Sequence, residues 1–250
     1  ASIVSCIAAA RENSRHVREQ ISTEQWHRLN CLYLYVIRPE VRRGMQADSG
    51  TTELAQPSEF LQSVLEAIHQ FQGVTDSTMS HGEGWQFIQV GRYIERATAT
   101  AMLLEAYHAD LWSHPERIPE GSEYLEWMGL LRSATAFEAY CKVYTADLTP
   151  DRILEFLLLD EKFPHSLRFS IDSMQHALEA IARESGKQRA EPLRRLGGKL
   201  QSLLGYSSVE DILHEDVIHF LRDIQLQCSA IHQTIYALYV DYPIQTALAG

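Results

Sequence analysis

Apolar residues recur along this chain every three or four positions, which is the spacing of one face of a helix. Ile3, Ile7, Ala10, Val17 and Ile21 show this spacing in the first segment. No segment shows the sustained alternation of apolar and polar residues that marks a strand. The pattern therefore predicts an all-α fold, a bundle of about eight to ten helices with short connections.

Serine and proline residues mark where the first helices begin and end. Ser22 is expected to cap a second helix that ends near Pro39, and the polar residues 40–56 are expected to form the longest loop. Pro57 opens a helix that continues through Phe71. The residues that define the core face of this helix are expected to be Leu61, Leu65 and Ile68.

Ser80-His81-Gly82-Glu83 resembles a capping box, and it predicts a long helix from about His81 to His108. The later helices are expected at 122–144, 153–159, 164–183 and 192–204, with a last helix or helix pair at 209–240. A loop is expected at 109–121 and a polar linker at 184–190. Because this linker is the only weak candidate for a boundary, we expect a single domain over residues 1–250.

Charge and composition limit the function. The chain is 45% apolar and 22% charged, as in ordinary globular proteins, and its net charge is −11. An acidic surface repels phosphate groups, so we expect neither a nucleic-acid partner nor an acidic membrane surface. No apolar run approaches the ~20 residues that span a bilayer, so the protein is expected to be soluble and cytoplasmic.

The four cysteines are far apart and form no C-x-x-C pair. They are Cys6, Cys31, Cys141 and Cys228, and each lies in an apolar, helix-like context. Such residues behave as small buried hydrophobic side chains. We therefore expect four buried thiols in a reducing compartment and neither a disulfide framework nor a zinc site.

The helix over 84–107 contains the main candidate for chemistry. Ile88, Gly91, Thr98 and Met102 fall on one face of this helix, and Glu95 falls in the middle of that face. A carboxylate is costly to bury unless a cation or a proton accompanies it. We therefore expect cations from neighbouring helices to converge on Glu95.

Two interpretations of such a cluster remain open. In the first, Glu95 is a catalytic acid or base, and the planar guanidinium groups of arginines bind an anionic or carboxylate substrate. In the second, the same groups form a structural ion-pair network that fixes the register of the helices. The residues assigned to substrate binding in the first interpretation are Arg11, Arg15, Arg92, Arg96, Arg132 and Glu138. Arg18 completes the stripe that Arg11 and Arg15 form beside the apolar face of the first helix.

A polar junction precedes the long helix. Asp76 lies close to Ser77, Thr78 and His81, so Asp76 is a further candidate for substrate binding and His81 is a candidate general base. The alternative is that these side chains cap two helix ends, which Asp, Ser and Thr commonly do.

Three E-x-x-H pairs resemble those of di-iron carboxylate sites in helical bundles, but such pairs also arise by chance in a glutamate-rich chain. They are Glu24/His27, Glu66/His69 and Glu105/His108. Glu66 points away from the expected core face, whereas di-iron ligands must face inward. There is no P-loop and no G-x-G-x-x-G motif. We therefore expect no metal and no cofactor.

Residues 73–107 resemble the alpha-E domain family, with Glu95-Arg96 as its E-R motif, and the blocks at 2–30 and 130–171 agree. The resemblance implies an α-helical bundle of unsettled function. It also implies association in bacteria with ATP-grasp ligase-like and transglutaminase-like proteins. Family members usually carry an additional N-terminal helical segment, and this chain is expected to begin after it.

Two functions follow as hypotheses. The first, implied by the resemblance, is a helical partner or accessory module of an ATP-grasp amidoligase or peptide-modification system. It predicts an exposed apolar patch. The second is an enzyme that acts on an anionic small molecule or peptide through the Arg/Glu cluster, and it predicts a buried polar cavity around Glu95.

Overall fold

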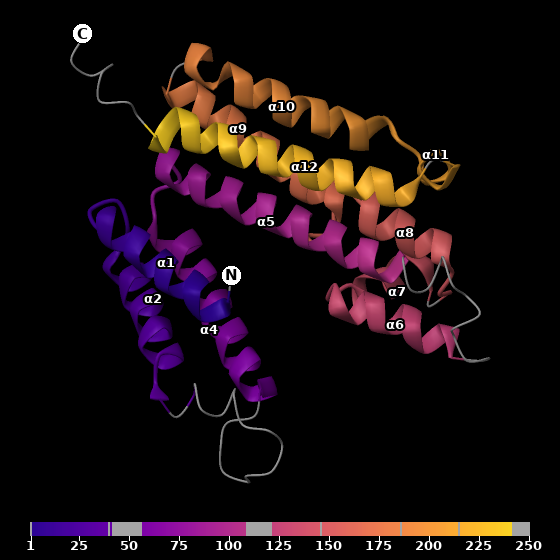
Figure 1. Ribbon diagram of the computed structural model, residues 1–250, viewed down its shortest axis with the longest axis horizontal. Helices are drawn as coiled ribbons and strands as arrows, with labels where there is room; N and C mark the ends of the chain where they lie inside the picture. The colour runs from indigo at the N-terminus through magenta and orange to yellow at the C-terminus, as the bar shows by residue number, and fades with distance from the viewer. Residues whose placement is uncertain are drawn as a thin grey trace. The chain divides into compact units, whose positions relative to one another are not determined.

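The computed structural model describes residues 2–39, 41, 57–108, 122–145, 147–185, 187–214 and 216–241. These residues form eleven α-helices and a short π-helical turn, and none of them forms a strand (Figure 1). The expected all-α fold is therefore confirmed. The expected loop at 109–121 lies outside the described residues, and of the expected loop at 40–56 only Val41 is described.

The chain divides into two compact units, Ala1–Trp85 and Gln86–Gly250. The boundary falls in the first turn of helix α5 (Glu83–Tyr107). Each unit has its own hydrophobic core. The polar stretch at 184–190 is not the expected linker, because its described residues are helical: α9 (Leu167–Ser185) ends at Ser185 and α10 (Lys187–Tyr206) begins at Lys187. Lysine, glutamine and arginine are good helix formers, which explains how a polar segment continues a helix.

The first unit consists of α1 (Ile3–His16), α2 (Thr23–Val36) and α4 (Pro57–Thr78). Helix α2 packs against both of the others. Their shared core contains Ile7, Leu32, Val36, Val41, Phe60 and Val64. Helix α1 ends at His16, before the expected end at Ile21, and a turn connects it to α2.

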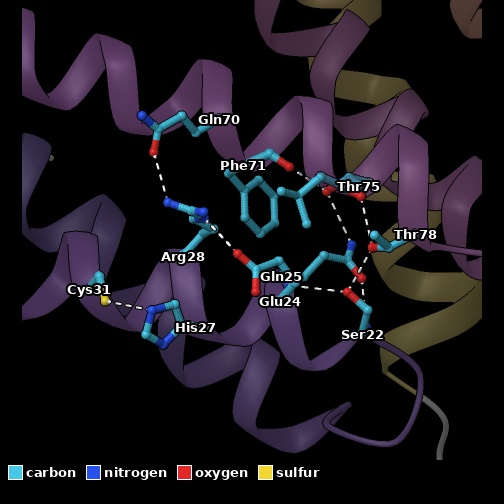
Figure 2. Close-up of polar contacts among 11 residues, drawn as sticks. Ser22, Glu24, Gln25, His27, Arg28, Cys31, Gln70, Phe71, Thr75 and Thr78 are labelled. Carbon is cyan, nitrogen blue, oxygen red and sulfur yellow. Dashed lines mark hydrogen bonds and ion pairs between the residues drawn. The ribbon is translucent and has the colours of Figure 1, made fainter.

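A buried polar contact joins α2 to α4. Gln25 is 0% exposed; its Oε1 accepts from the Ser22 amide at 2.7 Å, and its Nε2 donates to Thr75 Oγ1 at 3.1 Å (Figure 2). Ser22 and Thr78 are hydrogen-bonded at 2.8 Å beside it. Ser22 and Gln25 also form the capping box of α2, as the predicted cap at Ser22 requires. The Gln25 side chain therefore both caps the start of α2 and links α2 to α4.

The expected core face of α4 is wrong. Leu61 is 52% exposed, Leu65 is 45% exposed and Ile68 is 38% exposed. The core side of α4 is formed by Phe60 and Val64. Both sets have helical spacing and they lie one residue apart, which turns them about 100° from each other. Periodicity alone could not choose between them.

The second unit is built around α8 (Pro150–Leu159). This helix contacts α6 (Glu123–Ser133), α7 (Phe137–Tyr144), α9 (Leu167–Ser185), α10 (Lys187–Tyr206) and α11 (Val209–His214). Five of its ten residues are buried: Ile153, Leu154, Phe156, Leu157 and Leu158. Pro150 stands in the first turn of α8, as the Thr149-Pro150 signal predicts.

Long helices run beside this centre. Helix α9 packs along α10, and α10 packs along α12 (Val217–Ile235), which continues into the π-helical turn η3 (Tyr236–Val240). In Figure 1 the axes of α5, α12 and α10 lie roughly parallel within this unit, and the chain runs along α12 in the opposite sense to the other two. Helix α5 is tied to α12 by Glu105, which accepts from Arg222 at 2.7 Å and from Gln225 at 2.8 Å.

The single helix expected over 122–144 is broken. Helices α6 and α7 are separated by Ala134–Ala136, and Thr135 has a positive φ of 52°. The break allows Tyr140 to be fully buried against Phe156 of α8, with ring centroids 5.6 Å apart. Burial of a large aromatic ring offsets the strain of one left-handed threonine, which is of order 1–3 kcal/mol.

None of the described helices is both long enough and apolar enough to cross a membrane.

Replacing Gln25 by alanine should lower the free energy of unfolding by about 1–3 kcal/mol, because the change removes a cap and leaves a buried hydroxyl with a lost partner. Urea-induced unfolding of the full chain measures this. Gln70→Ala is the matched control, since exposed Gln70 only accepts from Arg28 at 3.2 Å. Equal effects of the two changes would contradict the assigned role of Gln25.

The cysteines should differ sharply in reactivity. Cys6 and Cys31 are exposed, which corrects the expectation that all four are buried, whereas Cys228 is buried and its burial raises the pKa of its thiol to about 11. Since the thiolate is the reacting species, alkylation of the native chain at pH 8 should label Cys6 and Cys31 first. Mass spectrometry should find Cys228 labelled only after unfolding. Labelling of Cys228 at the rate of Cys6 would contradict this burial.

Candidate functional site

Glu95 is exposed, so the expectation of a buried carboxylate on α5 is wrong. Among the described residues it has no hydrogen bond or ion pair. The side of α5 that packs into the core contains Val90, Ala97, Ala101 and Leu104. The small side chains of Ala97 and Ala101 face the core, whereas the large Met102 faces out. A helical-wheel projection that weights residues by hydrophobicity alone therefore assigns the wrong side of α5 to the core.

Arg96 points toward the connection between α8 and α9. Its Nη1 donates to the Pro164 carbonyl oxygen at 3.1 Å. One turn further along α5, Thr100 Oγ1 donates to the neighbouring carbonyl oxygen of His165, also at 3.1 Å. The Tyr93 ring meets Phe169 of α9 edge-on at 6.1 Å. These contacts hold the start of α9 against α5.

Arg92 lies beside Arg96. Their guanidinium carbons lie 5.7 Å and 5.5 Å from the centre of the Tyr93 ring. Burial, and then repulsion from Arg92, lowers the pKa of Arg96. Arg92 Nε is buried with no hydrogen-bond partner. The described residues provide no carboxylate within ion-pair distance of either guanidinium, so this pair has the charge to hold an anion.

Arg132 and Glu138 do not join this pair. Both are exposed, and they lie on the two separate helices α6 and α7. The Arg132 guanidinium stacks over the Phe137 ring at 5.4 Å. Glu138 lies in the first turn of α7, where the helix dipole favours a carboxylate.

Arg11 and Arg15 belong to the first unit, and both have partners there. Arg11 Nε donates to Asn30 Oδ1 at 2.8 Å, and its guanidinium lies 4.6 Å from the centre of the Tyr33 ring. Arg15 forms an exposed ion pair with Glu12 at 3.5 Å. The stripe on α1 therefore makes contacts that a structural role explains.

The polar junction before α5 forms helix-end contacts. Asp76 is exposed, and its backbone oxygen lies 3.1 Å from His81 Nε2. The His81 ring stacks on Trp85 at 4.2 Å. Thr78 donates back to the Val74 carbonyl oxygen at 2.8 Å. Between the two interpretations of this segment, the contacts favour capping of α4.

Each glutamate of the three E-x-x-H pairs has another partner. Glu24 pairs with Arg28 at 2.9 Å, Glu66 accepts from Gln62 at 2.9 Å, and Glu105 binds α12 as described. No group of three or more His, Cys, Asp or Glu side chains within the described ranges could hold a metal ion.

The surface that the sequence missed is the α4 stripe, which we define as Leu61, Leu65 and Ile68. Its three exposed apolar side chains follow one another at i, i+4 and i+7 along α4. This spacing is that of a helix that anchors in the groove of a partner. The signal was present in the sequence, but it was assigned to the core of the chain's own fold.

Residues 1–240 match the model of the Alpha-E family, described as a predicted alpha-helical domain with a conserved ER motif. The chain is 23% identical over 216 residues to an uncharacterized protein of Mycobacterium bovis, a match that covers 84% of this chain and 22% of that protein. An uncharacterized protein of Mycobacterium tuberculosis strain H37Rv is 22% identical over the same length, with the same coverage. The chain thus spans about a fifth of the length of these curated relatives. No solved structure matches it.

The two residues of the Glu95-Arg96 pair should respond differently to substitution. Arg96→Ala should lower the free energy of unfolding by about 1 kcal/mol, since it removes a charged donor from a backbone carbonyl. Glu95→Ala should change it by less than about 0.5 kcal/mol. Urea unfolding measures both, and faster amide hydrogen exchange at 163–169 in Arg96→Ala alone would locate the effect. Equal destabilisation by both changes would count against this assignment.

Proposed function

Since the chain belongs to the Alpha-E family, we propose that it is a helical partner module of an ATP-grasp ligase-like protein. The proposed setting is a bacterial amide-ligation or peptide-modification system in which a transglutaminase-like protein also takes part. The family resemblance supplies the identity of these partners. The module's task is to dock on the ligase and to shape or present its substrate.

The α4 stripe is the observation that carries this proposal. Leu61, Leu65 and Ile68 leave apolar surface in water on a helix whose other side already packs in the core. Full burial of an exposed leucine or isoleucine side chain is worth about 1.5–3 kcal/mol, and these three are about half exposed, so roughly half of that remains for each when a partner covers them. Contiguous exposed apolar side chains are typical of docking sites.

The length of the relatives supports the same role. The region similar to this chain is only 22% of the mycobacterial proteins, so in them it is joined to much further sequence. A domain that occurs within longer chains works beside other domains, which is what a partner module does. A cytoplasmic setting is part of the proposal, and the free cysteines suit a reducing compartment.

A second candidate function is an enzyme that acts on an anionic substrate. One observation favours it: Arg92 and Arg96 lie together without a described carboxylate partner. The exposed Glu95 weakens it, because a general acid or base benefits from a site that excludes water. We therefore rank this function below the partner module.

Affinity purification from the native cells tests the proposal. The tagged full chain should recover an ATP-grasp ligase-like protein in near-equal amount by quantitative mass spectrometry. The variant Leu61→Gln/Leu65→Gln/Ile68→Gln should recover at least about tenfold less, which corresponds to a loss of about 1.4 kcal/mol of binding. Glutamine keeps helix propensity, so the fold of α4 should be retained.

Leu226→Gln is the matched control, because Leu226 is an apolar residue of α12 that is 69% exposed and lies outside the α4 stripe. It should leave recovery unchanged. Circular dichroism should show the same unfolding midpoint for all three chains. Recovery of the tagged chain without any ligase-like protein would refute the proposed partner, and equal recovery by the stripe variant would refute the proposed surface.

A further inference from the structure

A cleft of about 570 Å³ lies within the second unit, where the end of α7, the last turns of α8, the start of α9 and the junction of α10 with α11 meet. Its volume is within the range of small-ligand sites. It shares no residue with the α4 stripe or with the Arg92/Arg96 pair. The function proposed above therefore does not rest on it.

Tyr144 forms one wall of this cleft and orients Glu155. The ring of Tyr144 is held by Tyr140, with centroids 4.9 Å apart, and by the Arg152 guanidinium at 5.8 Å. Its hydroxyl donates to Glu155 Oε2 at 2.9 Å. Burial, and then the bond to Glu155, raises the pKa of Tyr144 to about 12, so the hydroxyl stays a donor at neutral pH. A neutral donor fixes the carboxylate without cancelling its charge.

Asp160 is held in the same way. Its Oδ1 accepts from the backbone amides of Lys162 at 2.8 Å and Phe163 at 2.7 Å. These donors are also neutral, so they orient the second carboxylate and leave its charge available. Asp160 is the C-terminal cap of α8, and the carbonyl end of a helix favours a cation. The carboxylates of Glu155 and Asp160 and the carboxyl end of α8 thus all favour a cation in the cleft.

The other charged groups of the lining do not balance them. Arg168 is paired with Glu161 at 2.7 Å, so these two compensate each other. Of the other charged side chains in the lining, only Lys162 is positive, whereas Glu155, Asp160 and Glu210 are negative. Arg152, behind Tyr144, is paired with Asp147. The described part of the chain shows no ion pair for Glu155, Asp160 or Glu210. The cleft therefore keeps an excess of negative charge beside the apolar side chains of Leu159 and Val143.

We propose that this cleft binds an alkylammonium group, with its charge between Glu155 and Asp160 and its methylene stem along Leu159 and Val143. A lysine side chain of a peptide has this chemistry, and so does a free polyamine. Alkyl stems lie along apolar surface while their charged ends reach polar groups. Carboxylates held in place before binding lose little entropy when the ligand arrives.

Calorimetric titration of the full chain tests the inference. N-acetyl-lysine methylamide should bind, and N-acetyl-norleucine methylamide, which has the same stem without the charge, should bind at least about tenfold more weakly. Glu155→Gln and Asp160→Asn keep the shape of each side chain, and each should weaken binding of the lysine probe about fivefold. Tyr144→Phe should weaken it less, because Glu155 keeps its charge but loses its orientation.

Glu126→Gln, an exposed carboxylate of α6 outside the cleft, is the control and should leave binding unchanged. Thermal unfolding checks that each variant folds. Spermidine that displaces the lysine probe with the same dependence on Glu155 and Asp160 would identify a polyamine as the source and support the site. Equal binding of both capped amino acids, no binding of the lysine probe, or wild-type binding by the Glu155 and Asp160 variants would overturn the proposal. So would Ca²⁺ that binds in its place and depends on these carboxylates.

Discussion

The second unit depends on the burial of one short helix. Helix α8 is too short to be stable in water on its own, since isolated helices of fewer than ~12 residues are marginal. Ile153, Leu154, Leu157 and Leu158 are each fully buried, which supplies the stabilisation that its length does not. Five other helices contact it. The cleft beside Tyr144 exists because α7, α9 and α11 all meet α8 near its carboxyl end.

The sequence predicted the class of fold and most helix boundaries, because caps and prolines are local signals. Ser22 and Pro150 stand where their residue types indicate. It failed where tertiary packing decides. On α4 two apolar stripes compete, and only the partner helix selects Phe60 over Leu61. On α5 the close approach of neighbours selects alanine and threonine for the inner side, which an index of hydrophobicity ranks below Met102.

The candidate site was harder to predict than the fold, for a geometric reason. Consecutive residues on a helix point about 100° apart, so Glu95 and Arg96 cannot share one environment. The structure separates them: the arginine holds the entry to α9, whereas the carboxylate faces solvent. A sequence motif shows that two residues are adjacent, but it does not show that one of them contacts another helix while the other faces solvent. The break at Thr135 is a similar case, because no residue near it is a glycine or a proline.

The contact between Gln25 and Thr75 has a consequence for how α2 and α4 find each other. An apolar seam tolerates a shift of one helical turn, because one leucine replaces another with little change in energy. A buried amide tolerates such a shift poorly, since the shifted arrangement would remove the bond from Gln25 Nε2 to Thr75 Oγ1 and leave the buried amide nitrogen without that acceptor. A pair of aliphatic residues in place of Gln25 and Thr75 would stabilise the contact between α2 and α4 as well or better. Such a pair would, however, be compatible with several alignments of the two helices. The polar pair thus stabilises the contact less than aliphatic residues would, but it specifies a single alignment of the two helices.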